Sequence, residues 1–161
     1  MLPKETRTDR ETLELVLSSF VAAGNSKRPL QKQADSAYGF LYCFDLTPCC
    51  FPLSSVAWLN PVTPGLFFRT SLTYAHDGES RRRAAELLTA INYSLPAGCF
   101  ALDANDGEVL YKHAVYFGSA PLSVALVRGV LEPSFEFVSM YWEEVLSVVS
   151  GSAPPHNHPD G

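Results

Sequence analysis

The 161-residue chain has no apolar run that approaches the ~20 residues a transmembrane helix requires. Its first residues, Met1-Leu2-Pro3-Lys4 followed by polar and charged ones, lack the apolar centre of a secretory signal peptide. Positive charge is also scarce, because 12 Lys and Arg against 17 Asp and Glu leave a formal net charge of −5. That balance argues against a nucleic-acid-binding surface. We therefore expect a cytoplasmic protein that binds neither a membrane nor a nucleic acid.

The common motifs of catalysis and cofactor binding are missing too. The sequence has no glycine-rich dinucleotide or phosphate loop, no Gly-x-Ser-x-Gly nucleophile turn and no His-Glu-x-x-His zinc motif. Its four cysteines, which include Cys43 and Cys99, have neither Cys-x-x-Cys spacing nor the density of a disulfide scaffold. The adjacent Cys49 and Cys50 are compatible with a redox pair, but reduced loop thiols are the favoured interpretation. We expect no cofactor and assign no catalytic residue.

Two groups of residues could attract a metal ion, and neither has a suitable pattern. The turn Asp103–Glu108 holds three acidic residues, but its Gly comes too early for a calcium loop and no distal Glu follows. His156 and His158 lie near the C-terminus without a third ligand close in sequence. The sequence therefore predicts no metal site.

The clearest periodicities lie in the last part of the chain. Residues 81–95 predict an amphipathic helix, because apolar residues recur there at spacings of three and four. The turn Asn105-Asp106-Gly107 tolerates the positive φ angles of a tight hairpin and separates two alternating segments, 99–103 and 109–117. These segments predict a pair of antiparallel strands.

A long amphipathic helix is predicted at the end of the chain, stopping at Gly151. Its apolar residues are spaced by 4, 3, 4, 3 and 4 and are Leu131, Phe135, Val138, Trp142, Val145 and Val149. Pro133 lies inside this pattern and has no backbone N–H, so we expect a kink or a break there.

The earlier part of the chain predicts one helix and three strands. The helix runs from residue 9 to a stop at Gly24-Asn25, and the strands cover 38–44, 54–60 and 66–74. The polar segment 26–37 is expected as a loop that could include a ragged strand. The predicted order is helix, three strands, helix, two strands, helix. This order indicates an α+β domain in which helices pack on a five-stranded antiparallel sheet. We expect a single domain over 1–151 and a flexible tail over 152–161.

A set of residues between 91 and 151 supports a family resemblance: Ile91-Asn92, Gly98 to Asp103, Asp106 to Val109, Leu122, Tyr141-Trp142, Val148 and Gly151. In these residues the chain resembles the bacterial YbjN-like family, whose members share the fold of type III secretion chaperones. The similarity covers residues 54–151 well and 9–53 only through the order of elements. It implies a regulatory or chaperone-like protein, and the family has no established catalytic residues to transfer.

Five residues are candidates for contact with a partner. Arg81, Arg82 and Arg83 form the densest positive charge, at a helix start where they oppose the helix dipole. They could dock an acidic segment of a partner, or they could form a solvated helix face. Phe137 and Tyr141 add aromatic surface to the last helix, which could face a partner or pack on the sheet.

The sequence thus predicts a non-enzymatic protein-interaction module, regulatory or chaperone-like, that binds another protein or itself as a homodimer. The alternative is a small-ligand-binding protein or an enzyme with a pocket between sheet and helices near His113 and Tyr111. His113 lies on the apolar face of its predicted strand, where a core imidazole bonded to a neighbour is favoured over a catalytic base.

Overall fold

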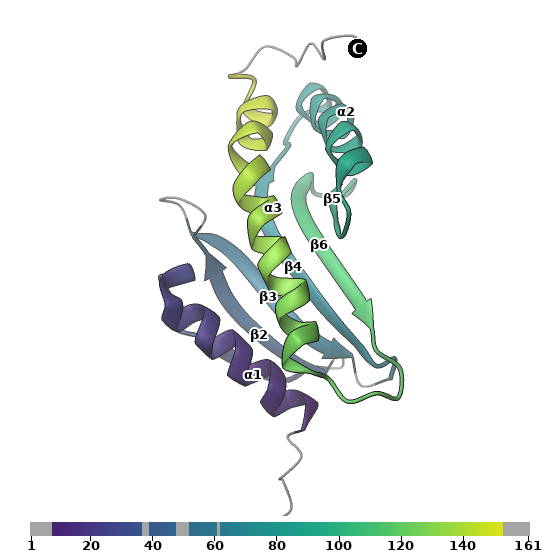
Figure 1. The fold of residues 1–161 in the computed structure, drawn as a ribbon. Helices are drawn as coiled ribbons and strands as arrows, with labels where there is room; N and C mark the ends of the chain where they lie inside the picture. Colours follow the sequence, from purple (N-terminus) through teal and green to yellow (C-terminus); the bar gives the residue numbers. More distant parts are fainter. Residues whose placement is uncertain (1–7, 37–38, 48–51, 61, 153–161) are drawn as a thin grey trace, which may run out of the picture.

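Six strands form one antiparallel sheet in the computed structural model, which describes residues 8–36, 39–47, 52–60 and 62–152 (Figure 1). The order across the sheet is β1-β2-β3-β4-β6-β5, and all neighbouring strands are antiparallel. The bounds of the strands are β1 Gln31–Ser36, β2 Gly39–Leu46, β3 Leu53–Asn60, β4 Gly65–Tyr74, β5 Cys99–Leu102 and β6 Glu108–Tyr116.

The structure confirms the predicted α+β class with an antiparallel sheet, but the predicted number of five strands was wrong. The sixth strand is β1, which lies inside the segment 26–37 that we expected to be a loop with at most a ragged strand. Its sequence, Gln-Lys-Gln-Ala-Asp-Ser, shows no alternation of apolar residues. An edge strand can be polar throughout because its backbone pairs with one neighbour and charged side chains discourage further pairing.

The first helix, α1, covers Asp9–Phe20. It begins at Thr8, whose side chain accepts a hydrogen bond from the Glu11 N–H, while the Glu11 carboxylate accepts one from the Thr8 N–H. This reciprocal pair satisfies two backbone donors at the helix start. The chain continues through a π-helical turn, Val21–Asn25, in which Gly24 has a φ of +88°. The predicted stop at Gly24-Asn25 is therefore confirmed.

The second helix, α2, covers Gly78–Ser94 and lies beside the predicted hairpin turn between β5 and β6. It is capped by Asp77, whose side chain accepts from the Ser80 N–H. Gly107 in the turn has a φ of +81°, and a β-carbon there would lie 2.0 Å from the Ala75 carbonyl oxygen. Only glycine fits this approach. The Ala75 N–H donates to the Gly107 carbonyl at 2.8 Å, so the turn is tied to the segment before α2.

The third helix, α3, runs without interruption from Val124 to Ser150, so the chain does not break at Pro133. The proline removes one backbone donor from a helix of 27 residues. Buried residues on both sides of it, including Val130 and Val138, hold the two halves against the same core. The contacts of α3 with the core therefore outweigh the loss of one backbone hydrogen bond at Pro133. The helix ends at Gly151, whose φ of +76° is the left-handed conformation common after a helix.

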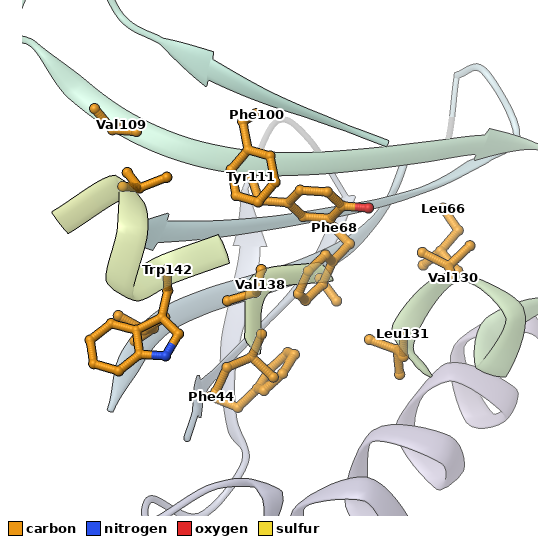
Figure 2. Close-up of a cluster of buried hydrophobic side chains, with 14 of the residues drawn as sticks. Phe44, Leu66, Phe68, Phe100, Val109, Tyr111, Val130, Leu131, Val138 and Trp142 are labelled. Carbon is orange, nitrogen blue, oxygen red and sulfur yellow. The ribbon is translucent and has the colours of Figure 1, made fainter. Parts of the chain in front are cut away.

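One face of the sheet and the three helices enclose the hydrophobic core (Figure 2). Strand side chains alternate between this face and the other, as the burial of every second residue in β3 shows. The ring of Tyr111 lies 6.4 Å from that of Phe68 on β4 and 5.1 Å from that of Phe100 on β5. α3 supplies the opposing layer, with Val127, Val130, Val138 and Val145 fully buried.

The edge of the sheet at β5 is covered by a side chain. The Phe100 N–H donates to Asn92 Oδ1 at 2.8 Å, and Asn92 Nδ2 donates to the Phe100 carbonyl oxygen at 2.8 Å. The amide of Asn92, on α2, thus occupies the backbone groups that a seventh strand would use. Natural sheets cover their edges in this way to prevent unwanted pairing.

The sequence predicted a protein that does not bind a membrane, and the structure bears on one part of this expectation, the presence of a membrane-spanning helix. Within the described residues, no helix has both the length and the apolar character needed to cross a bilayer.

Trp142 provides a test of the core assignment. It lies in the middle of the α3 stripe and is only 7% exposed (Figure 2). Trp142→Ala should lower the free energy of unfolding by ~3–5 kcal/mol, because it leaves a large cavity. Urea unfolding measures the loss. Tyr93→Ala, at a site 95% exposed, is the control and should cost less than ~0.5 kcal/mol. Equal losses in the two variants would contradict the assignment.

Candidate functional site

The face of the sheet opposite the core carries none of the described helices, and we call it the open face. Directly opposite residues define a first row across it: Leu41 pairs with Trp58, Trp58 with Phe67, and Phe67 with Ala114. The rings of Trp58 and Phe67 are stacked at 5.2 Å with an angle of 13° between their planes. Tyr116 meets Phe67 edge-on at 5.7 Å and is 66% exposed. The centre of the first row is therefore aromatic, and Tyr116 extends this surface on β6.

A second row lies next to the first and is charged at its centre. Val56 pairs with Arg69, Arg69 with Lys112, and Lys112 with Cys99. Arg69 Nη2 bonds to Glu108 Oε2, and the side chains of Arg69 and Glu108 are 42% and 7% exposed. Lys112 is exposed and has no ion pair among the residues that the structure describes.

The two rows border a hollow of about 930 Å³. Its apolar lining includes Trp58, Phe67, Ala101, Leu110 and Ala114. Its charged lining consists of Arg69, Lys112 and Asp103. An open cavity of this size, mostly apolar and with a few polar groups, is a typical binding site.

Two of the three arginines that were candidates for partner contact form hydrogen bonds with backbone carbonyls. Arg81 donates from Nε to the Ala75 carbonyl at 3.1 Å and from Nη1 to the Ala104 carbonyl at 2.9 Å. Arg83 donates from Nε to the Val148 carbonyl at 3.0 Å and from Nη2 to the Val149 carbonyl at 3.3 Å. Arg81 thus ties α2 to the β5–β6 turn, and Arg83 satisfies carbonyls at the C-terminal end of α3.

Arg82 lies on the solvent side of α2, between two carboxylates. It forms ion pairs with Glu79 at 2.8 Å and with Glu86 at 2.6 Å. These hydrogen bonds raise the pKa of Arg82, and the bond from Arg82 lowers the pKa of Glu79. The positive charge of Arg82 is therefore balanced within its own helix. A partner-binding role for the three arginines stays a prediction.

Phe137 and Tyr141 are half-buried and pack towards the sheet. The ring of Phe137 lies 6.4 Å from that of Tyr111, and the ring of Tyr141 meets that of Phe100 edge-on at 5.9 Å. Both side chains thus use part of their surface in the core. Their partner-binding role also stays a prediction, and they lie on the opposite face of the sheet from the hollow.

His113 is buried between β6 and α3, with 9% of its surface exposed. Its Nδ1 lies 3.2 Å from Ser134 Oγ, and Ser134 also donates to the Val130 carbonyl. Burial lowers the pKa of His113 and raises that of neighbouring Tyr111, whose hydroxyl donates to the Ala97 carbonyl at 3.2 Å. His113 is therefore the core imidazole that the sequence favoured, with Ser134 as its partner.

The residues weighed in the sequence as metal ligands or a redox pair can be placed only in part. In the turn between β5 and β6, Asp103 Oδ1 accepts from the Asn105 N–H at 2.8 Å and Asp106 Oδ1 from the Glu108 N–H at 2.9 Å. These carboxylates thus stabilise the turn itself. No group of three His, Cys, Asp or Glu side chains suited to a metal occurs within the described ranges. The Cys49-Cys50 pair and the tail histidines lie outside those ranges.

Sequence reasoning did not single out the open face. It identified the strands from their alternation and assigned no role to the face that carries Trp58 and Phe67. The available signal was the type of those residues, because Trp58 and Phe67 stand where a solvated face normally has polar side chains. No protein-family model matches the chain, and no curated protein is significantly similar to it.

The contacts of Arg83 lead to a prediction about stability. Arg83→Gln removes charge-assisted hydrogen bonds to the end of α3 and should lower the free energy of unfolding by about 1–2 kcal/mol. Arg82→Gln is the matched control, and it should leave the urea midpoint unchanged because exposed ion pairs contribute little. A shift of the midpoint in Arg82→Gln alone would contradict the structural role of Arg83.

The burial of His113 predicts a dependence of stability on pH. Because its pKa is lowered in the folded state, the unfolded chain binds more protons once the pH falls below about 6.5. This part of the stability is therefore present above that pH and lost below it, at up to ~1.4 kcal/mol per pH unit. Urea unfolding at pH 7.5, 6.5 and 5.5 should show a shallower loss for His113→Gln than for the parent. His76→Gln, at an exposed site, should follow the parent. Parallel curves for the parent and His113→Gln would exclude this linkage.

Proposed function

We propose that the chain is a non-enzymatic protein-interaction module that binds another polypeptide on the open face. The observation that carries this proposal is the hollow of about 930 Å³ beside the stacked rings of Trp58 and Phe67. Both rings are half-buried, and the part of their surface that meets water would lose that contact when a partner covers it, which favours association. Interfaces are enriched in such aromatic residues and in arginine.

The family resemblance supports the same type of function. YbjN-like proteins share the fold of type III secretion chaperones, and the α+β architecture with helices on one face of an antiparallel sheet is compatible with that relationship. A regulatory or chaperone-like role, a cytoplasmic location, a bacterial origin and homodimer formation are parts of this proposal. Fold similarity alone does not determine function, so the open face carries the argument.

An enzyme centred on His113 receives less support. Ser134, its hydrogen-bond partner, is completely buried, and the ring of His113 lies on the core side of β6. His113 is among the residues that line the hollow, but its Nδ1 faces Ser134 on α3, on the other side of the sheet. The arrangement fits a polar link in the core better than an active site.

The proposal is tested by filling the hollow without adding charge. Ala114 is exposed on the open face, and Ala114→Gln places a polar amide beside Phe67. Ala90→Gln, at an exposed position on α2, is the matched control. Affinity capture from a lysate of the source cell, read out by mass spectrometry, should recover a partner with the parent and with Ala90→Gln. Recovery with Ala114→Gln should fall at least tenfold. Equal recovery with both variants would contradict binding at this face.

A further inference from the structure

Two cations in the hollow are placed at a cost to the fold. Arg69 and Lys112 are directly opposite in the β4–β6 register, where Cβ atoms are about 5 Å apart and like charges destabilise the pair. Arg69 is balanced by Glu108, but no described carboxylate forms an ion pair with Lys112. The fold therefore gives no reason for a lysine at this position, whereas a bound anion would.

The charges of the hollow match one carboxylate. The bond between Arg69 and Glu108 leaves that pair neutral, so Lys112 contributes one surplus positive charge beside them. The other nitrogens of Arg69 form no hydrogen bond with the residues that the structure describes, so they remain available as donors. Asp103 also borders the hollow and would repel a group with two negative charges. A single carboxylate suits this site better than a phosphate.

The apolar part of the site is the row of Trp58 and Phe67, which lies two residues along the strands from the charged row. Phe67 precedes Arg69 by two residues, and two residues along a strand span about 6.6 Å. Side chains two positions apart in an extended peptide point to the same side and are separated by the same distance. A peptide that places a carboxylate at Lys112 can therefore place a large apolar side chain on Phe67 and the stacked Trp58.

We infer that the hollow binds a polypeptide segment in which an Asp or Glu lies within two positions of an aromatic or large aliphatic residue. The carboxylate accepts hydrogen bonds from Lys112 and Arg69, and the apolar side chain packs on Trp58 and Phe67. This inference rests on the proposed function and specifies the partner's chemistry. The segment lies on the face of the sheet, because Asn92 occupies the middle of the β5 edge.

Two other occupants fit the same observations less well. A nucleic acid would meet Asp103 and Glu108 beside the two cations, on a chain of net charge −5. A second copy docked symmetrically over the hollow would bring Lys112 against the same residue of its partner. A peptide with one carboxylate and a nearby apolar side chain avoids both the repulsion between phosphates and carboxylates and the repulsion between two lysines.

The first part of the test identifies the preferred peptide chemistry. A phage-displayed library of random 12-residue peptides is selected on the immobilised full-length chain and compared with the unselected library. We expect the selected peptides to be enriched in Asp or Glu within two positions of Trp, Phe, Tyr, Leu or Ile. Selected peptides without an acidic preference would overturn the inference.

The second part measures the affinity of one selected peptide by fluorescence polarisation. Lys112→Gln should weaken binding roughly tenfold, since it removes a charge-assisted bond. Lys32→Gln should not, because Lys32 is exposed on the opposite face of the sheet, next to Tyr42. Changing the acidic residue of the peptide to its amide should weaken binding to the parent to a similar extent and add little on Lys112→Gln. Unchanged binding to Lys112→Gln would overturn the inference.

Failure of the inference can be told apart from failure of the proposed function. A peptide that binds the parent and Ala90→Gln, but not Ala114→Gln, and that tolerates Lys112→Gln would retain the open face and reject the carboxylate site. Peptides that bind Ala114→Gln as well as the parent would reject both.

Two further measurements address the competing occupants. Tighter binding of a random single-stranded RNA 20-mer than of any selected peptide, lost in Lys112→Gln, would overturn the inference in favour of a nucleic acid. A dimer in sedimentation velocity that dissociates in Ala114→Gln but not in Ala90→Gln would overturn it in favour of a second copy.

Discussion

The packing of α3 across β4 and β6 is the interaction on which the rest of the structure depends. Its side chains contact the central strands through ring contacts such as that of Phe137 with Tyr111, and through the hydrogen bond between Ser134 and His113. α1 and α2 also pack against α3, so all three helices lie on the same face of the sheet (Figure 1). None of the described helices covers the opposite face. The aromatic side chains on that face, Trp58, Phe67 and Tyr116, are therefore not needed to pack a helix.

Much of the fold follows from local patterns in the sequence. The alternation in β6, the turn at Gly107 and the capping residues of the helices each specify their element through short-range physics. β1 was left out of the predicted strand count because a polar edge strand is defined by its pairing with β2, which no local pattern reveals. At Pro133 the sequence indicated the lost donor but not the core contacts on both sides of it, and those contacts keep α3 continuous.

The candidate site was harder to predict than the fold. An alternating pattern separates the two faces of a strand only when one face is polar, and Phe67 lies between core residues of β4 on a face that is apolar too. The register that brings Lys112 beside Arg69 depends on β4 pairing with β6 rather than with the next strand in the chain. Arg83 shows a second limit of local patterns, because its carbonyl acceptors on α3 lie 65 and 66 residues further along the chain.

The two tryptophans of the chain allow the most direct test of the account, because Trp58 lies on the open face and Trp142 in the core. The measurement is a titration of ¹⁵N-labelled protein with a peptide selected on the chain, following the two indole N–H resonances by NMR. The account predicts that the Trp58 resonance shifts with peptide concentration while that of Trp142 stays in place. A shift of the Trp142 resonance with an unchanged Trp58 resonance would contradict it.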